Sequence, residues 1–133
     1  MNHVVVAAAF AALAFGGCSK KPTEGGVRLE QVSESFSSAG LKVQNFQPTD
    51  PGRFAALKCM TGNVEGVDTM VCEYGSPEAR AAAQKAGEQW AGNVTTAAVL
   101  GNGRTLLAVA DRAHGDPNGK AIHKITQAFV RTK

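Results

Sequence analysis

The stretch LKCMTGNVEGVDTMVCEY, residues 57–74, predicts a β-hairpin, because two strand-like runs surround the turn-forming segment GNVEG. We expect the strands over Phe54–Thr61 and Val67–Tyr74. Each run contains one cysteine, and these two residues test how the strands are aligned. The alignment matters because a shift of one residue would move every side chain to the other face of the sheet.

Placing Cys59 opposite Cys72 gives three further opposed pairs: Lys58 with Glu73, Leu57 with Tyr74 and Val64 with Val67. A charge pair, an aliphatic–aromatic pair and a β-branched pair are all favourable across antiparallel strands. The alignment puts five residues on one face, with Lys58 and Glu73 on the other. Those five are Leu57, Cys59, Met70, Cys72 and Tyr74.

The turn decides whether the two cysteines can be linked. If Glu65 and Gly66 form a two-residue loop, Cys59 and Cys72 form a non-hydrogen-bonded pair with Cα atoms about 4.5 Å apart. That distance lies within the roughly 4.4–6.8 Å that a disulfide allows. Glu65 is a poor residue for the positive φ of a type I′ turn. A four-residue loop would keep the same alignment, whereas a three-residue loop with Gly66 in a bulge would not.

The amino-terminal half of the domain predicts one helix and one strand before the hairpin. A helix over Arg28–Ala39 has the apolar stripe Leu29, Val32, Phe36 and Ala39, and Gly40 follows it as a stop. The segment Leu41–Phe46 alternates apolar and polar residues, as a half-buried strand does. Pro48, Pro51 and Gly52 are expected to end this strand in a loop.

The carboxyl-terminal half predicts a helix, a second hairpin and a final helix. Ser76-Pro77-Glu78 has the residues of a helix start, and the helix should reach about Ala91 with Ala79, Ala82, Ala83, Ala86 and Trp90 on one face. Val94–Leu100 and Arg104–Ala110 flank Asn102-Gly103, a strong hairpin signal. Asp116-Pro117 opens the last helix, whose stripe is Ile122, Ile125 and Phe129.

The order of these elements is helix, three strands, helix, two strands, helix. Because both hairpins are local, the sheet should be mostly antiparallel, with four to five strands. We therefore predict an α+β fold, a two-layer sandwich with the helices on one face of the sheet.

The first residues of the chain form an apolar run that ends at a cysteine. Val4–Phe15 reads VVVAAAFAALAF, twelve residues without a charge. A membrane span needs about 20 apolar residues, so this run is too short to be one. Its length suits the apolar part of a secretory signal. The run ends in Phe15-Gly16-Gly17-Cys18, and with these residues the segment resembles the signal peptide of bacterial lipoproteins. The resemblance implies cleavage before Cys18 and acyl chains on that cysteine.

The resemblance divides the chain into a signal peptide (1–17), a lipidated cysteine with its tether (18–26) and one α+β domain (27–133). The tether SKKPTEGG, residues 19–26, reaches less than about 30 Å even when extended. Lys20 and Lys21 would lie at the lipid headgroups. The expected location is the bacterial cell envelope, with a lipid anchor in the membrane and the domain in the periplasm.

Two cysteines remain after Cys18 is assigned to the lipid, and an exported protein lies in an oxidising compartment. We therefore expect a disulfide between Cys59 and Cys72. The alternatives are a metal-binding pair, although zinc sites favour closer spacing, and two reduced thiols in the core. The net charge of +3 is spread along the chain, and nucleic acid is therefore not an expected partner.

The densest group of candidate ligands is Asp111, His114, Asp116 and His123, which could hold a divalent metal. The simpler interpretation is that Asp116 caps a helix, Asp111 ends a strand and both histidines are solvated. Trp90 is either a core residue or, if exposed, a contact for a partner or a sugar. No catalytic motif and no phosphate-binding glycine motif occurs in the sequence.

These observations predict a lipid-anchored envelope protein that is not an enzyme and needs no cofactor. Its domain would be an interaction or accessory module, with the membrane and an envelope protein as partners. The alternative is a periplasmic protein that binds a small ligand or a metal through the Asp111–His123 region.

Overall fold

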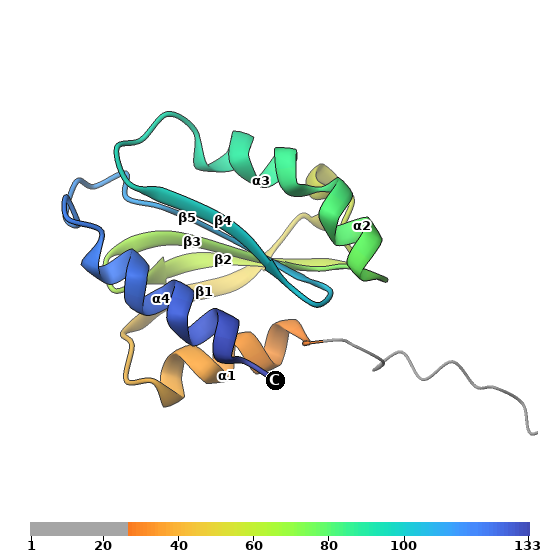
Figure 1. The fold of residues 1–133 in the computed structure, drawn as a ribbon, viewed down its shortest axis with the longest axis horizontal. Helices are drawn as coiled ribbons and strands as arrows, with labels where there is room; N and C mark the ends of the chain where they lie inside the picture. Colours follow the sequence, from red (N-terminus) through yellow and green to blue (C-terminus); the bar gives the residue numbers. More distant parts are fainter. Residues whose placement is uncertain (1–26) are drawn as a thin grey trace, which may run out of the picture.

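The computed structural model describes residues 27–133, so the predicted signal peptide, Cys18 and the tether lie outside the described residues. The elements follow one another as α1 (Leu29–Ser38), β1 (Val43–Thr49), the 3-10 helix η1 (Pro51–Phe54), β2 (Lys58–Val64), β3 (Val67–Glu73), α2 (Pro77–Ala82), α3 (Gln84–Ala91), β4 (Ala97–Asn102), β5 (Thr105–Ala110) and α4 (Lys120–Arg131). Five antiparallel strands form one open sheet in the order β1-β2-β3-β5-β4 (Figure 1). The α+β class, the antiparallel sheet and the order of elements are thus confirmed.

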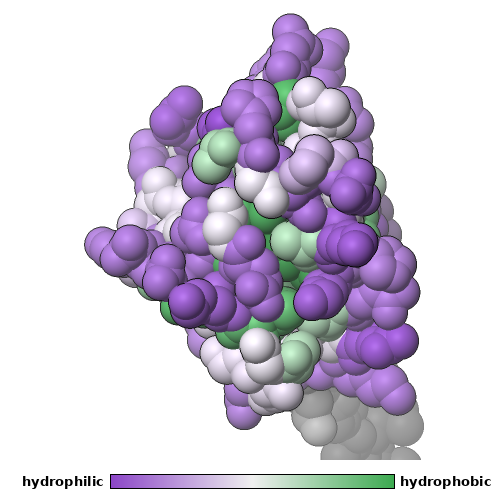
Figure 2. All heavy atoms as spheres, turned by 90° about the vertical axis from the view of Figure 1, so that its left-hand side faces the viewer, coloured by the Kyte–Doolittle hydropathy of each residue, from purple (hydrophilic) through white to green (hydrophobic). Residues whose placement is uncertain are grey.

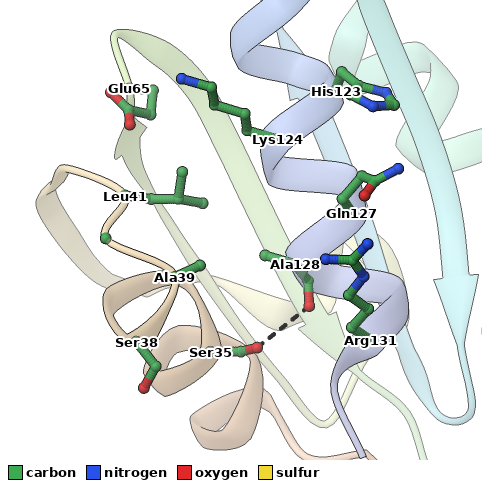
Figure 3. Close-up of a pocket in the computed structure, with 11 residues that line it drawn as sticks. Ser35, Ser38, Ala39, Leu41, Glu65, His123, Lys124, Gln127, Ala128 and Arg131 are labelled. Carbon is green, nitrogen blue, oxygen red and sulfur yellow. Dashed lines mark hydrogen bonds between the residues drawn. The ribbon is translucent and has the colours of Figure 1, made fainter.

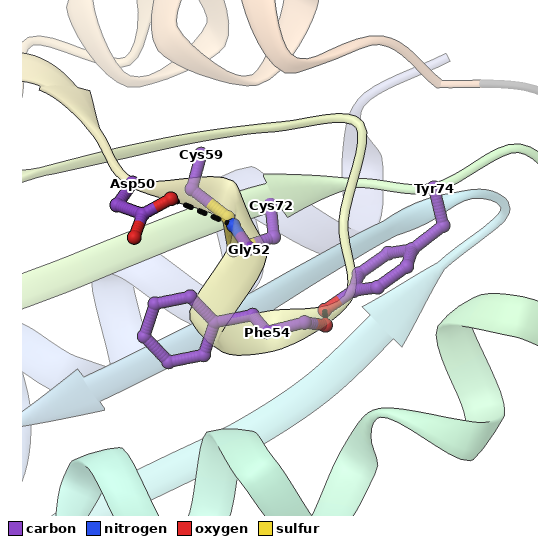
Figure 4. The surroundings of a disulfide bond; sticks show 6 residues. All are labelled: Asp50, Gly52, Phe54, Cys59, Cys72 and Tyr74. Atoms are coloured by element: carbon purple, nitrogen blue, oxygen red, sulfur yellow. Dashed lines mark hydrogen bonds between the residues drawn. A yellow bond between two sulfur atoms is a disulfide. The ribbon is translucent and has the colours of Figure 1, made fainter.

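The hairpin of β2 and β3 has the predicted alignment, with Cys59 opposite Cys72 and Val64 opposite Val67. The two cysteines form a disulfide, and their Cα atoms are 4.1 Å apart. Both cysteines are buried, and the adjacent Tyr74 hydroxyl donates a hydrogen bond of 3.0 Å to the Phe54 carbonyl (Figure 4). The disulfide and its aromatic neighbours therefore belong to the core.

The turn of this hairpin has two residues, as the simplest alignment required. Glu65 has φ 53° and Gly66 has φ 81°, both in the left-handed region that a type I′ turn demands. The Glu65 N–H donates a hydrogen bond of 2.8 Å to the Lys42 carbonyl, which ties the turn to the start of β1. Glu65 thus adopts a positive φ, which costs free energy for a residue with a side chain.

Leu57 departs from the predicted face assignment. The strand β2 begins only at Lys58, and Leu57 is 64% exposed instead of packing beside Tyr74. Its N–H donates to the Glu73 carbonyl at 2.9 Å. On the opposite face of the sheet, Lys58 forms ion pairs with Glu30 and Glu73, as the predicted charge pair suggested.

Strand β1 is longer than expected, because it continues through Pro48 to Thr49. Pro48 is tolerated there because β1 is an edge strand and needs no N–H bond on its outer side. The pairing of β1 with β2 is interrupted by a bulge between Gln44 and Gln47. The prediction that Pro48 ends the strand was therefore wrong, and the loop is reduced to η1 and its flanks.

Helices cover both faces of the sheet, so the two-layer arrangement with helices on one face was wrong (Figure 1). Strand β5 explains the difference: all six of its residues are buried, as in a strand covered on both sides. The helices α1 and α4 pack against each other on one face, and the sheet buries an apolar cluster against them. Its largest buried members include Leu29, Phe36, Leu107, Ile125 and Phe129.

The other face carries α2 and α3, which replace the single helix predicted over residues 76–91. The chain bends at Ala83, whose N–H bonds to the Arg80 carbonyl as in a 3-10 turn. The bend brings Gly87 against the sheet, where an added Cβ would lie 2.9 Å from a Val99 methyl carbon. Ala83 and Gly87 are buried, whereas Ala79 and Ala82 are exposed, so the predicted alanine stripe is only partly correct.

The disulfide should contribute strongly to stability, because it closes a loop in the unfolded chain. We expect the double variant Cys59→Ala/Cys72→Ala to lose about 3 kcal/mol of unfolding free energy in urea. Adding reductant to the unaltered protein is the control, because it removes the cross-link without removing the side chains. An unchanged urea midpoint in both arms would contradict the expectation.

Candidate functional site

One half of the sheet is left open on the face that α2 and α3 cover. The helix α3 packs on β4 and β5, whereas no α-helix of residues 27–133 lies above the corresponding face of β1 and β2 (Figure 1). The cross-strand pairs identify the residues there. Gln47 opposes Thr61, and Thr61 opposes Met70 of the buried cluster that also contains both cysteines. Because opposed residues share a face, Gln47 and Thr61 lie on this open half.

A groove of about 580 Å³ runs over this open half, and we call it the Trp90 groove. Its lining residues are Asn45, Gln47, Pro48, Thr49, Thr61, Gly62, Asn63, Asp68, Trp90 and Arg112. The volume falls in the roughly 300–1,000 Å³ range of small-molecule sites. Five of the ten lining residues have amide or hydroxyl side chains, in contrast to the apolar residues that the same face presents beneath α3.

Arg112 organises one side of the groove. Its guanidinium carbon lies 4.4 Å from the centroid of the Trp90 ring, and its Nη1 donates to Asp68 Oδ2 at 3.1 Å. A third contact joins Nη2 to the Trp90 carbonyl oxygen. Since Asp68 pairs with Arg112, the two charges of the groove offset each other. Three segments, α3, β3 and the chain after β5, are thereby held together at one point.

The bulge in β1 forms the opposite side. Asn45 has φ 52°, in the left-handed region where an asparagine is tolerated better than most residues. Gly62 lies beneath it, and an added Cβ there would stand 2.7 Å from the Asn45 carbonyl oxygen. Only glycine at position 62 therefore allows the bulge to approach β2 so closely. Bulges of this kind often occur beside functional sites, where they reorient a side chain.

The polar side chains of the groove are free to bind something else. Within residues 27–133, the side chains of Gln47, Thr61 and Asn63 make no hydrogen bond to the protein, and neither does the Trp90 indole N–H. Trp90 is half-buried: it packs on the cluster around the disulfide while lining the groove. The core and binding interpretations of Trp90 are therefore compatible.

A second groove, of about 560 Å³, lies between α1 and α4 and is called here the α1–α4 groove (Figure 3). Its α4 side presents His123, Lys124, Gln127 and Arg131, and its α1 side presents Ser35 and Ser38. The Ser35 hydroxyl donates a hydrogen bond of 3.2 Å to the Ala128 carbonyl, which joins the two helices at the bottom of the groove. Glu65 from the hairpin turn closes one end.

The residues proposed as an alternative metal site have other roles. Asp111 is buried and accepts hydrogen bonds from the backbone N–H groups of Gly115 (3.0 Å) and Asp116 (2.8 Å). Asp116 is buried too and accepts from Ala121 and Ile122, both at 3.0 Å.

His114 and His123 are exposed, and His123 instead lines the α1–α4 groove. In the described part of the chain, no three His, Cys, Asp or Glu side chains come together so that they could hold a metal ion. The suggestion that Asp111, His114, Asp116 and His123 form such a cluster was therefore wrong.

Asp116 caps the last helix with its carboxylate, but it lies further before the helix than the sequence predicted. The helix α4 begins at Lys120, after Gly119 with φ 70°, and the Asp116 carboxylate reaches its first N–H groups. Burial raises the pKa of Asp116, but the N–H bonds from Ala121 and Ile122 outweigh it, so the pKa lies below its ordinary value.

The two ends of the molecule differ. At one end α1 begins, and its Leu29 N–H donates to Glu73 Oε1 at 2.9 Å. The opposite end, which we call the far end, contains the turn between β2 and β3, the end of α3 and the segment after β5. Hydrophilic residues cover most of the far end and frame apolar residues in its middle (Figure 2). Arg112 and Asp68 lie at this end, and so does the Glu65 side of the α1–α4 groove.

Sequence reasoning singled out Trp90 but missed Arg112, Asp68 and the polar residues of β1 and β2. The available signal was the alternation in β2, where Cys59, Thr61 and Asn63 share a face that turns from apolar to polar along the strand. Searches with family models, among curated proteins and among solved structures found no match to this chain. None of the helices in residues 27–133 combines the length and the apolar sequence that a membrane span requires.

The role of Asp116 predicts a defined pH dependence. Because its pKa is lowered in the folded protein, the ionised carboxylate stabilises the fold fully above the unfolded pKa, and this contribution is lost as pH falls through the folded pKa. We expect Asp116→Ala to cost about 1–2 kcal/mol at pH 7. The stability gap between Asp116→Asn and the unaltered protein should close as pH falls below about 4.

Urea unfolding at neutral and acidic pH measures this gap. Glu34→Gln is the matched control, since Glu34 is exposed on α1. A gap that stays constant or widens on acidification would show that Asp116 does not act through its charge.

Proposed function

We propose that this protein is a lipid-anchored lipoprotein of the bacterial cell envelope, and that its domain is a non-enzymatic binding module. One combination carries the proposal: a lipobox-like cysteine, Cys18, lies nine residues before a domain whose other two cysteines form a buried disulfide. Disulfides form and persist in oxidising compartments. The disulfide thus supports export independently of the apolar run that resembles a signal peptide.

The placement of the grooves supports a binding role. A tether from Cys18 would enter the domain at Val27, next to the start of α1, whereas Arg112 and Asp68 lie at the far end. The strand β3, with seven residues, spans about 20 Å between the two ends. An anchored domain would therefore present the Trp90 groove on the side away from its attachment point.

A second candidate function is that of a small-ligand-binding protein. The Trp90 groove favours it, because this groove has a suitable volume and polar side chains that have no hydrogen-bond partner within residues 27–133. This candidate moves the ligand site away from the Asp111–His123 region, whose carboxylates hold backbone N–H groups. The two functions are compatible, since a tethered module can bind a small or a large partner.

The anchor is tested by mass spectrometry of the protein extracted from its native envelope. We expect the mature chain to begin at Cys18 and to carry acyl chains. We also expect Cys18→Ser to leave an uncleaved precursor without acyl groups. Cys59→Ser is the control for loss of a cysteine elsewhere, and it should keep the acyl chains. A mature chain without lipid, or acylation that persists in Cys18→Ser, would contradict the proposal.

A further inference from the structure

The Trp90 groove offers its ligand no net charge. Its charged residues are Asp68 and Arg112, which pair with each other at 3.1 Å. Because each of these charges already has a partner, the groove offers no unpaired charge among the described residues that would attract an ionic ligand. The α1–α4 groove differs, because Lys124 and Arg131 line it and neither makes an ion pair within the described residues. The chemistry of the Trp90 groove is therefore better suited to uncharged ligands.

An added peptide strand is a poor occupant of this region. Peptides bind to sheets by pairing with a regular edge strand, and β1 is the nearest edge. The bulge between Gln44 and Gln47 breaks the regular spacing of its N–H and C=O groups, and Pro48 lacks an N–H altogether. Both features are means by which proteins block edge-strand pairing.

The remaining polar groups are matched to hydroxyl and amide groups on a ligand. Asn45, Gln47 and Asn63 each present both a donor and an acceptor, and the Thr61 hydroxyl does the same. Beside them, Trp90 lines the groove with Arg112 stacked on its ring, and its indole N–H has no hydrogen-bond partner among the described residues. Sugars combine apolar C–H faces with hydroxyl groups that donate and accept, so their chemistry complements this lining.

We propose that the Trp90 groove is a binding site for a neutral oligosaccharide. Asn45, Gln47, Thr61 and Asn63 would bond to its hydroxyl or acetamido groups. The part of the Trp90 indole that Arg112 leaves uncovered would contact a sugar ring, and Asp68 would position Arg112 against the indole. The proposal names a ligand class for the binding module proposed above. It does not depend on the lipid anchor, because the groove belongs to the folded domain.

Intrinsic fluorescence tests the proposal directly, because Trp90 is the one tryptophan of the chain. The full chain in detergent is titrated with a tetramer of N-acetylglucosamine, with cellotetraose, and with a blocked tetra-alanine peptide. We expect a saturable fluorescence change with at least one tetrasaccharide and none with the peptide. The affinity should stay within about twofold between low and high salt, since the ligand carries no charge.

Matched variants assign the signal to the groove. Asn63→Ala and Gln47→Ala should each weaken binding roughly 2- to 10-fold, as expected for the loss of one hydrogen bond. Gln127→Ala, which removes the same type of side chain from the α1–α4 groove, should leave the affinity unchanged. Calorimetry on Trp90→Phe, which lacks the reporter, should show weakened binding.

Three results would overturn the proposal. The first is the absence of a saturable fluorescence change with either tetrasaccharide. The second is an affinity that is the same in the unaltered protein and in all three alanine variants. The third is a fluorescence change with the peptide and none with the sugars. None of them bears on acylation of Cys18, which mass spectrometry tests separately. Failure of the ligand assignment is thus distinguishable from failure of the proposed function.

Discussion

The disulfide between Cys59 and Cys72 holds β2 and β3 in one alignment, and the other layers depend on that alignment. It places Val64, Val67 and Val71 on the face covered by α1 and α4, and Cys59, Met70 and Cys72 on the face covered by α3. A shift of β3 by one residue relative to β2 would turn Val67 and Val71 toward α3, and Met70 and Cys72 toward α1 and α4. Since β5 pairs with β3 on the other side, the alignment also determines where the segment after β5 meets Asp68.

The same constraint creates the open half of the sheet. Beyond the edge of α3, the residues that share the disulfide's face become polar, with Thr61 and Asn63 in β2 and Gln47 in β1. A core extending to β1 would need apolar residues at these positions and a further helix above them. The chain instead has a bulge at Asn45, a glycine beneath it and an arginine stacked on Trp90. The groove is thus part of the fold. The lipid anchor and the sugar ligand remain proposals.

Local signals were sufficient to predict much of this fold. The hairpin alignment could be derived because cross-strand pairs such as Lys58 with Glu73 lie close together in the sequence and can be compared directly. The second hairpin followed from Asn102-Gly103, and α1 from its stripe Leu29, Val32 and Phe36. The number of layers was predicted wrongly because the apolar run of β5 was not weighed as a sign of burial on both faces. The bend at Ala83 has no local signal in a run of alanines, because it follows from the close contact of Gly87 with Val99.

The site was less predictable than the fold. Asp68, Trp90 and Arg112 are far apart in the sequence, and they meet only because β5 inserts between β3 and β4 and α3 packs above it. The metal site predicted at Asp111–His123 was wrong for the opposite reason. Its residues are close in sequence, but its carboxylates accept hydrogen bonds from backbone N–H groups of the loop and of α4. Proximity in the sequence was a good guide to strand pairing and a poor guide to binding chemistry.

The central claim is that the disulfide-linked alignment puts Thr61, Asn63 and Asp68 on one face beside Trp90. Nuclear Overhauser spectroscopy tests it, because residues in non-hydrogen-bonded antiparallel pairs have closely spaced backbones and hence strong contacts between Hα protons. The alignment predicts strong Hα–Hα signals for Cys59 with Cys72, Thr61 with Met70 and Asn63 with Asp68. Signals that instead join Thr61 to Thr69 or Val71 would place these side chains on the opposite face and contradict the account.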